Sequence, residues 1–224
     1  MTTKVGLVTI GQSPREDVGG EIREILGTGI EIIQKGALDG LSRGEIEKLR
    51  PEKEFPLITR LADGTSALVG RKKIIPFLQK HIDELEESGV EIIGLLCTDE
   101  FPELRSRGLL LRPFRILFQA VVAVLGEGKL GVFVPLAEQK KEARAKWEKA
   151  GPAVIVEALN PYEEAEDIKG AVKNLIKAGV GLIVLDCIGY PLRIKEKIRA
   201  ASGKPVLLAR AVLAQAIREF AGKV

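Results

Sequence analysis

The sequence predicts an α/β protein with two pseudo-symmetric domains, and three observations support this fold class. Short apolar runs alternate with amphipathic helical segments along the chain, which is typical of βαβ units. The segment that ends at Cys97 matches the segment that ends at Cys187 at a constant offset of 90 positions. Lys4–Thr9 resembles Lys129–Val134 at an offset of 125. We therefore expect two doubly wound parallel sheets, Rossmann-like or flavodoxin-like, with an interdomain cleft.

The composition narrows the classes of function. The 224 residues suffice for two domains of roughly 100 residues each, and 46% apolar with 29% charged residues is typical of a soluble globular protein. The net charge is only +3, the two signs are interspersed, and aromatic residues make up 4%. We expect no nucleic-acid partner and no membrane partner. The first residues show neither a secretory signal nor a membrane span, so we expect a cytoplasmic location.

The first domain is expected to span residues 1–112. Ser13 and Pro14 fit an N-cap and the first position of a helix, and Ser42 and Glu45 have the spacing of a capping box. Asp63-Gly64 suits a tight turn, which predicts a hairpin insertion over residues 57–70. The expected strands of the main sheet cover residues 4–10, 30–34, 89–97 and 109–111, and the expected longer helices cover 14–26 and 71–87.

The second domain is expected to span residues 113–210. Its alternation of apolar strands and helices follows the same order as in the first domain. The expected helices cover residues 114–125, 136–149, 162–178 and 191–201, and the expected strands cover 129–134, 153–159, 180–187 and 205–208. A last helix, over residues 211–222, is expected to return to the first domain.

The two cysteines are the chain's only ones, and each follows an apolar strand. Ligands of parallel sheets bind beyond the carboxyl ends of the strands, where both sulfurs are expected. A thiol and a thiolate can then act as acid and base on opposite faces of one carbon. Two other interpretations stay open: both cysteines are buried small hydrophobes, or the two form a disulfide.

The loop Gly11–Asp17 opens a helix at the carboxyl end of the first strand. Its backbone N–H groups, with Gly11, Gln12, Ser13 and Arg15, are expected to bind a carboxylate. The alternative for Ser13 and Arg15 is a helix cap and a solvated arginine.

Residues that follow the cysteines are further candidates. Thr98 can donate to an anion or serve as a turn hydroxyl. Asp186 can act on Cys187 or cap the next helix. Tyr190 and Phe101 can line a pocket or simply pack. Two distant cysteines and one histidine make a poor metal set, so no metal is expected. A Gly-x-Gly-x-x-Gly motif at 126–131 precedes a strand instead of following one, so no dinucleotide is expected.

Four segments in this order resemble the AroM family: 8–17, 36–42, 95–98 and 185–190. That family is similar in layout to the aspartate/glutamate/hydantoin racemase superfamily, whose members have two α/β domains and two catalytic cysteines. By position Cys97 and Cys187 correspond to these cysteines, and Ile188, Gly189 and Tyr190 are expected to contact substrate. The resemblance implies no cofactor.

The sequence departs from the amino-acid racemases where the cysteines are followed by Thr98-Asp99 and Ile188-Gly189. In the racemases Asn-Thr typically follows the first cysteine and Thr-His the second. We therefore expect racemase-like or isomerase-like chemistry on a small-molecule carboxylate other than glutamate. The alternative is a non-catalytic metabolite-binding or regulatory protein on the same scaffold. A second copy of the chain, forming a homodimer, is left open as a further partner.

Overall fold

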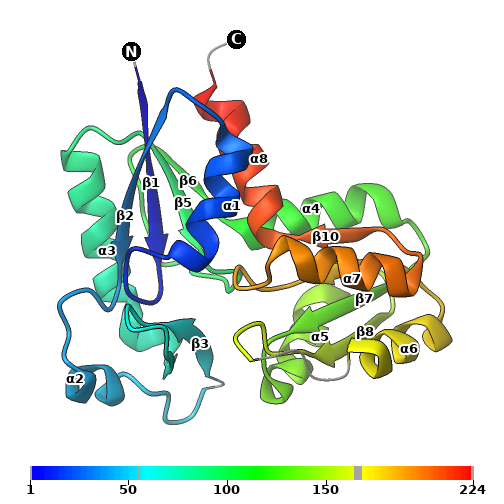
Figure 1. The fold of residues 1–224 in the computed structure, drawn as a ribbon. Helices are drawn as coiled ribbons and strands as arrows, with labels where there is room; N and C mark the ends of the chain where they lie inside the picture. Colours follow the sequence, from blue (N-terminus) through cyan, green and yellow to red (C-terminus); the bar gives the residue numbers. More distant parts are fainter. Residues whose placement is uncertain (1, 55, 164–167, 223–224) are drawn as a thin grey trace. The chain divides into compact units, whose positions relative to one another are not determined.

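The computed structural model describes residues 2–54, 56–163 and 168–222. The chain divides into two compact units (Figure 1). The first unit comprises Met1–Pro113 and Leu213–Val224, and the second comprises Phe114–Val212.

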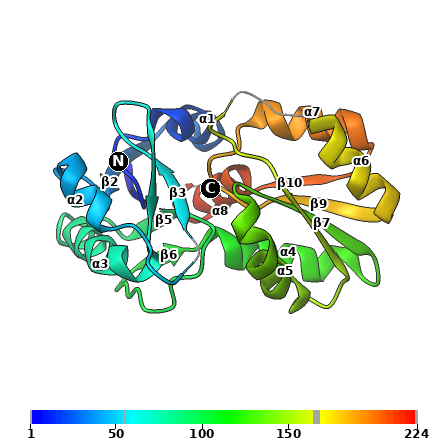
Figure 2. The same cartoon turned by 90° about the horizontal axis from the view of Figure 1, so that it is seen from below.

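The first unit is built on a four-stranded parallel sheet with the strand order β2-β1-β5-β6. Its strands are rich in Val, Ile and Leu because both faces of the sheet are covered. Figure 2 shows α1 and α3 on opposite faces. The strands are β1 (Thr3–Thr9), β2 (Ile30–Gly36), β5 (Ile92–Leu96) and β6 (Leu109–Leu111), and the helices are α1 (Glu16–Leu26), α2 (Arg43–Lys48), α3 (Arg71–Glu87) and, from Leu213 on, α8 (Ala209–Ala221).

Two local motifs of the first unit confirm what the sequence predicts. Ser42 and Glu45 form a reciprocal capping box at the start of α2. The strands β3 (Leu57–Arg60) and β4 (Ser66–Val69) pair antiparallel. Gly64 in their connection has a φ of 80°, which a side chain would disfavour.

The second unit has a four-stranded parallel sheet with the order β10-β9-β7-β8. Figure 2 shows α6 and α7 on one face of this sheet, with α4 and α5 on the other. The strands are β7 (Lys129–Val134), β8 (Val154–Ala158), β9 (Val180–Leu185) and β10 (Val206–Leu208), and the helices are α4 (Pro113–Leu125), η1 (Ala137–Gln139), α5 (Lys140–Glu148), α6 (Ile168–Ala178) and α7 (Leu192–Ser202).

The two sheets have the same strand order, with β1, β2, β5 and β6 corresponding to β7, β8, β9 and β10. The register agrees with both sequence offsets. Gly6 pairs with Ile93, and Gly131, 125 positions after Gly6, pairs with Ile183, 90 positions after Ile93. A β-carbon on Gly6 would meet Leu85 of α3, and one on Gly131 would meet Leu175 of α6, again 90 positions later. Each glycine therefore lets its helix approach the sheet closely.

Several helix starts differ from the prediction; the last helix, for example, begins at Ala209 instead of residue 211. Helix α1 begins at Glu16 instead of Pro14, and its N-cap residue is Arg15, which makes no side-chain cap. The hydroxyl of Ser13 donates to Asp39 instead of capping the helix. The helix expected over 162–178 is observed as Ile168–Ala178, and residues 164–167 lie outside the described part of the chain.

Candidate active site

Each cysteine lies at the topological switch point of its own sheet. In the first unit the chain runs from β1 outward to β2, and from β5 outward to β6, so the strand order reverses between the two central strands. Strands β7 and β9 repeat this arrangement in the second unit. Thr9 pairs with Leu96 directly before Cys97, and the N–H of Asp186, directly before Cys187, donates to the carbonyl of Phe133. Doubly wound sheets bind their ligands at such points.

The two cysteine turns have the same hydrogen-bond pattern. The backbone N–H of Asp99 donates to Sγ of Cys97 at 3.4 Å, and the N–H of Gly189 donates to Sγ of Cys187 at 3.3 Å. Cys97 is buried and Cys187 half-buried, and both are thiols, not disulfide halves. A donor aimed at sulfur favours the thiolate over the thiol. We call residues 9–15 and 97–99 the first half-site, and residues 187–190 with Arg210 the second half-site.

Ser13 in the first half-site holds a carboxylate of the chain itself. Its N–H donates to Oδ1 of Asp39 at 2.7 Å, and its hydroxyl donates to Oδ2 at 2.6 Å. The N–H of Gly36 donates to the same Oδ2 at 2.7 Å. These three donors form a binding site for one carboxylate group, and the side chain of Asp39 occupies that site.

The loop N–H groups, expected to be free for an anion, donate within the first unit. The N–H of Gly11 donates to Oγ1 of Thr9, that of Gln12 to the carbonyl of Arg60, and that of Arg15 to the side chain of Gln34. The expectation of free donors at these positions is therefore wrong. A carboxylate-binding role of Gly11, Gln12, Ser13 and Arg15 stays a prediction.

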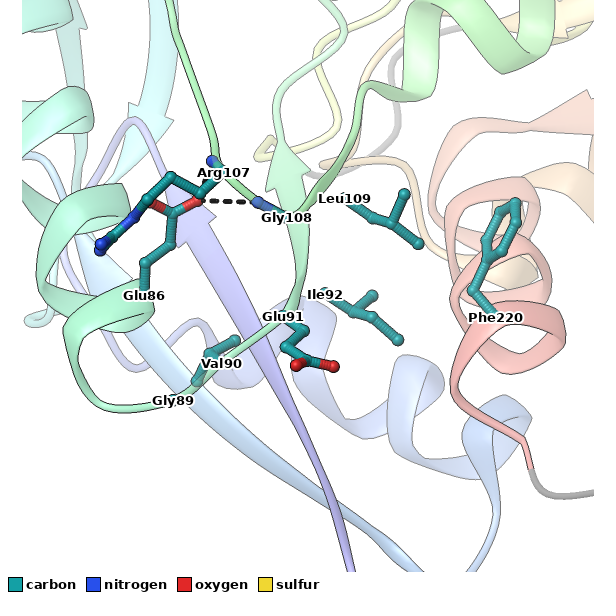
Figure 3. Close-up of a pocket in the computed structure, with 9 residues that line it drawn as sticks. All are labelled: Glu86, Gly89, Val90, Glu91, Ile92, Arg107, Gly108, Leu109 and Phe220. Atoms are coloured by element: carbon teal, nitrogen blue, oxygen red, sulfur yellow. Dashed lines mark hydrogen bonds and ion pairs between the residues drawn. The ribbon is translucent and has the colours of Figure 1, made fainter.

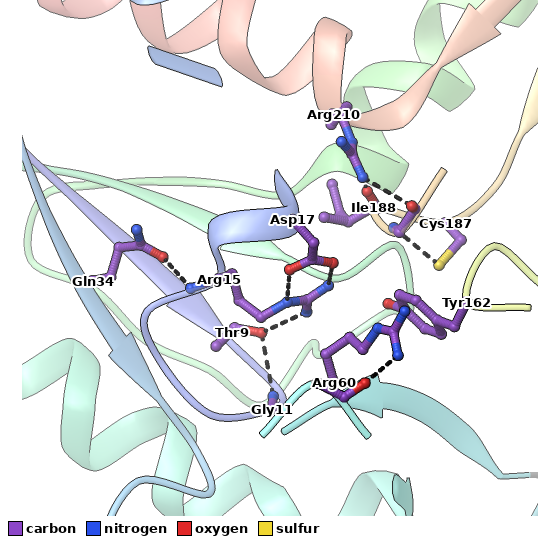
Figure 4. A network of polar contacts seen from close by, with 12 residues as sticks. Thr9, Gly11, Arg15, Asp17, Gln34, Arg60, Tyr162, Cys187, Ile188 and Arg210 are labelled. Carbon is purple, nitrogen blue, oxygen red and sulfur yellow. Dashed lines mark hydrogen bonds and ion pairs between the residues drawn. The ribbon is translucent and has the colours of Figure 1, made fainter. Parts of the chain in front are cut away.

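Arg15 is buried, with 3% of its side chain exposed. Its Nε and one terminal nitrogen donate to the two carboxylate oxygens of Asp17 at 2.8 and 2.7 Å, and its other terminal nitrogen donates to Oγ1 of Thr9 at 3.2 Å (Figure 4). The alternative of a solvated arginine is wrong.

The residues after Cys97 are held by Arg71, the first residue of α3. Its guanidinium donates to the carbonyl of Glu100 at 2.7 Å. It also lies 4.0 Å from a carboxylate oxygen of Asp99 and 3.6 Å from one of Glu103. Thr98, the residue directly after Cys97, is buried, at 7% exposure. Phe101 is fully buried in the core of the first unit, as its packing alternative predicts.

Arg210 holds the turn after Cys187. Its side chain is 1% exposed, and it donates to the carbonyls of Ile188 at 2.9 Å and Gly189 at 2.8 Å. Figure 4 shows the guanidinium over this turn, with Cys187 on its other side. Ile188 is itself buried, at 2% exposure.

Tyr190 packs in the core of the second unit and is fully buried. Its hydroxyl donates to the carbonyl of Leu159 at 2.6 Å. Burial raises the pKa of Tyr190 well above its ordinary value of 10.0, and the charge of Cys187 adds to the effect. The ring packs in the core, as the packing alternative predicts. No observation tests contact of Tyr190 with substrate, which stays a prediction.

Asp186 does not cap the helix after Cys187, because the N-cap of α7 is Pro191, without a side-chain bond. Its carboxylate accepts from Nε1 of Trp147 at 2.7 Å and pairs with Nζ of Lys146 at 2.8 Å. The ammonium of Lys146 also lies 4.1 Å from the ring centroid of Phe114. Asp186 therefore ties the end of β9 to α5, and the capping interpretation is wrong.

A further hollow of about 640 Å³ lies at the amino ends of β5 and β6 (Figure 3). Among its lining residues are Glu86, Arg107, Leu109 and Phe220. It lies at the end of the sheet opposite to Cys97, so it is separate from the first half-site.

Among the described residues, no group of three or more His, Cys, Asp or Glu could hold a metal ion. No helix in the same ranges is long and apolar enough to cross a membrane.

Sequence reasoning missed three residues that organise the half-sites: Asp39, Arg71 and Arg210. Asp39 occurs in the segment 36–42 that resembles the AroM family, but nothing local indicates that it binds Ser13. Arg210 does leave a signal, because it is the only charged residue in the apolar run 206–214. A lone arginine in such a run is buried only when it has partners.

The AroM family model, described as AroM protein, matches residues 5–221. No curated protein is significantly similar to the chain. Solved structures with a similar fold include glutamate racemase from Aquifex pyrophilus (TM-score 0.61, 19% identity, 97% of this chain and 84% of that chain). The Picrophilus torridus aspartate racemase aligns with a TM-score of 0.62 and 15% identity over 99% of this chain and 95% of that chain. The maleate isomerase Iso from Pseudomonas putida S16 aligns with a TM-score of 0.67 and 14% identity over 98% and 93%. At these identities the structures establish the racemase-like fold of the chain.

Proposed function

The chain belongs to the AroM family, and on this premise we propose that it is a cofactor-independent, racemase-like or isomerase-like enzyme. Its substrate is a small carboxylate, and Cys97 and Cys187 act as the acid and the base. The observation that carries the proposal is the repeated cysteine turn. In both units a sulfur at the switch point accepts a hydrogen bond from the backbone N–H two residues later. Ligands of such sheets bind at the switch point, so a cysteine there is placed to react with a ligand.

In the proposed reaction one sulfur takes a proton from the substrate carbon, and the other sulfur donates a different proton to that carbon. The thiolate of one cysteine takes the hydrogen from the carbon next to a carboxylate or carbonyl and becomes a thiol. The electron pair of the broken C–H bond delocalises into that neighbouring group as an enolate. The thiol of the other cysteine donates its proton to the opposite face of the carbon and becomes the thiolate. Such general acid–base catalysis contributes typically 10²- to 10⁴-fold per group.

One observation favours a second candidate, a non-catalytic metabolite-binding or regulatory protein on the same scaffold. Ser13 and Arg15 are the residues expected to hold a substrate carboxylate, and they pair with Asp39 and Asp17. For catalysis, the substrate has to displace Asp39 or be held by other groups, and Thr98, the residue after Cys97, is one candidate.

Exchange of the α-proton tests the proposal. Wild-type protein, Cys97→Ser and Cys187→Ser are incubated in deuterated water with dicarboxylates, amino acids and hydantoins, and deuterium uptake is followed by NMR. We expect uptake by at least one substrate with the wild type and a loss of about 100-fold or more in each variant. Undiminished uptake in both variants would exclude the cysteines. Absence of uptake together with calorimetric binding of a carboxylate would support the binding protein.

A further inference from the structure

A continuous chain of hydrogen bonds leads from Arg210 to the sulfur of Cys187. The Nε–H of Arg210 donates to the carbonyl oxygen of Ile188 at 2.9 Å. The N–H of Gly189, which donates to Sγ of Cys187 at 3.3 Å, belongs to the same peptide group as that carbonyl. One peptide unit therefore connects the guanidinium to the sulfur.

We propose that Arg210 is a positioning residue that favours the thiolate of Cys187 over that of Cys97 by polarising and fixing the peptide between Ile188 and Gly189. A cation that binds a peptide oxygen withdraws electron density, and the N–H of the same peptide becomes a stronger donor. Cys187 is then the sulfur that starts as the base in the proposed reaction. That last assignment rests on the proposed function, whereas the thiolate preference does not.

Burial of Arg210 strengthens the effect of its charge on the peptide between Ile188 and Gly189. The Arg210 side chain is 1% exposed, and an arginine stays charged in a protein interior. Its second bond, to the carbonyl of Gly189 at 2.8 Å, fixes the next peptide as well. The fork of the guanidinium thus binds two successive carbonyls and holds the turn in one conformation. A lysine has no such fork.

Gly189 is required for the close packing of this turn. A β-carbon at this position would lie 2.6 Å from the Tyr162 hydroxyl oxygen and 3.0 Å from Pro161. The peptide therefore lies between Arg210 on one side and the segment at Tyr162 on the other. This packing supports a fixed direction for the N–H that points to Cys187.

The turn after Cys97 has a different cation. Arg71 binds the carbonyl of Glu100, one residue beyond the peptide positions that Arg210 contacts, and it is 25% exposed. Its charge is shared with the carboxylates of Asp99 and Glu103. The N–H that serves Cys97 belongs to Asp99 itself, an acidic residue. Arg71 is therefore expected to favour the thiolate of Cys97 less.

Other charged or titratable groups near Cys187 in the second unit include Asp186 with its partner Lys146, Tyr190 and Tyr162. Asp186 is paired with Lys146 at 2.8 Å, so these two charges largely compensate each other. Burial keeps Tyr190 protonated by raising its pKa well above 10.0. The hydroxyl of Tyr162 lies next to Gly189. Lys146 is bound to Asp186, whereas Arg210 is the cation with hydrogen bonds to the carbonyls of the cysteine turn.

The test measures the pH dependence of alkylation by iodoacetamide, which needs neither substrate nor turnover. In a Cys97→Ser background, Arg210→Met and Arg210→Lys are compared with the parent. We expect Arg210→Met to shift the midpoint of the rate profile upward and to lower the rate at pH 7 by roughly three- to tenfold, with the plateau at high pH unchanged. Arg210→Lys is expected to fall between. The matched control is Arg193→Met, which removes an exposed arginine of the same unit and is expected to leave the midpoint unchanged.

Two outcomes would overturn the proposal. One is an unchanged midpoint in a folded Arg210→Met variant, or in Arg210→Lys if the methionine variant does not fold by circular dichroism. The other comes from the wild-type chain, in which mass spectrometry follows each cysteine separately: a midpoint for Cys187 at or above that of Cys97 contradicts the proposal. Failure of the deuterium exchange alone would reject the enzymatic reaction and leave the thiolate preference intact.

Discussion

The two half-sites have the same backbone frame and different surroundings. Both cysteines follow a central strand, and both sulfurs accept the N–H two residues later. The turn after Cys187 is bound by the buried Arg210, whereas the turn after Cys97 contacts the partly exposed Arg71, whose charge is shared with carboxylates. A repeated frame therefore supplies two cysteines at equivalent positions, and the surrounding residues give each cysteine turn different charged neighbours.

The loops after β1 and β7 show the same principle. The first is polar and is fixed by Ser13, Arg15 and Asp39, with hydrogen bonds to a carboxylate. The second continues as Pro135-Leu136-Ala137, and the N–H of Leu136 donates to the side chain of Gln139. Side chains that bind carboxylates are thus concentrated in the loop after β1, where their partners are Asp39 and Asp17.

The largest effect on stability is expected at Gly36, which lies against the backbone of the polar loop after β1. A β-carbon there would lie 2.5 Å from the carbonyl oxygen of Gly11 and 2.7 Å from the backbone nitrogen of Ser13, and neither can move like a flexible side chain. We expect Gly36→Ala to lower the free energy of unfolding by about 3 kcal/mol. Urea denaturation measures this difference.

The control for this prediction is Gly44→Ala in α2. A β-carbon on Gly44 meets nothing within 4 Å, and alanine favours a helix over glycine by about 1 kcal/mol. The control is therefore expected to be neutral or more stable. A loss in Gly36→Ala no larger than in the control would show that the polar loop can shift without cost.

A second contrast concerns the edge strands. Glu86, at the end of α3, accepts hydrogen bonds from Ser106, Arg107 and Gly108 directly before β6. Ile176, 90 positions after Glu86 in the second unit, is an exposed apolar residue of α6. Burial alone would raise the pKa of Glu86, but these hydrogen bonds outweigh it and lower the pKa from 4.5 to about 2.

The Glu86 carboxylate therefore stabilises the folded state above the pKa of the unfolded chain, and this contribution is lost as the pH falls through the folded value of about 2. We expect Glu86→Gln to cost about 1–3 kcal/mol above pH 5, with the difference from wild type shrinking between about pH 4.5 and 2. Denaturant titrations at several pH values measure it. Exposed Glu87→Gln is the control and is expected to change little. A cost that does not vary with pH would contradict an ionised, hydrogen-bonded Glu86.

The smallest effect on stability is expected at Tyr190. This residue has no tyrosine counterpart in the first unit, since the position 90 residues earlier is Glu100. Tyr190→Phe removes the donor to the Leu159 carbonyl and is expected to cost about 1 kcal/mol. Because the folded pKa of Tyr190 is raised, this difference is constant below about pH 10 and falls at higher pH, where only the unfolded chain ionises. A Tyr190→Phe variant as stable as wild type in urea would leave the ring packing as the whole role of this residue.

The sequence by itself determined the repeat and most of the elements. The constant offsets between Gly6 and Gly131 and between Cys97 and Cys187 predicted two equivalent parallel sheets, and the register confirms this correspondence. The capping box of Ser42 and Glu45 was readable for the same reason, because both signals lie within a few residues of one another along the chain.

Only the tertiary structure decided which polar groups form hydrogen bonds with one another. Ser13 has the sequence signature of a helix cap, yet Asp39, 26 positions later, accepts its hydrogen bonds. Arg15 is interpreted from the sequence as a carboxylate ligand or as a solvated residue, and its side chain is buried. Arg210 reaches the Cys187 turn from 21 and 22 positions away. Such pairings depend on loops that meet where parallel strands end, and local sequence patterns carry no information on distant partners. The physical reason is that a buried polar group must find a partner, and the fold decides which partner is within reach.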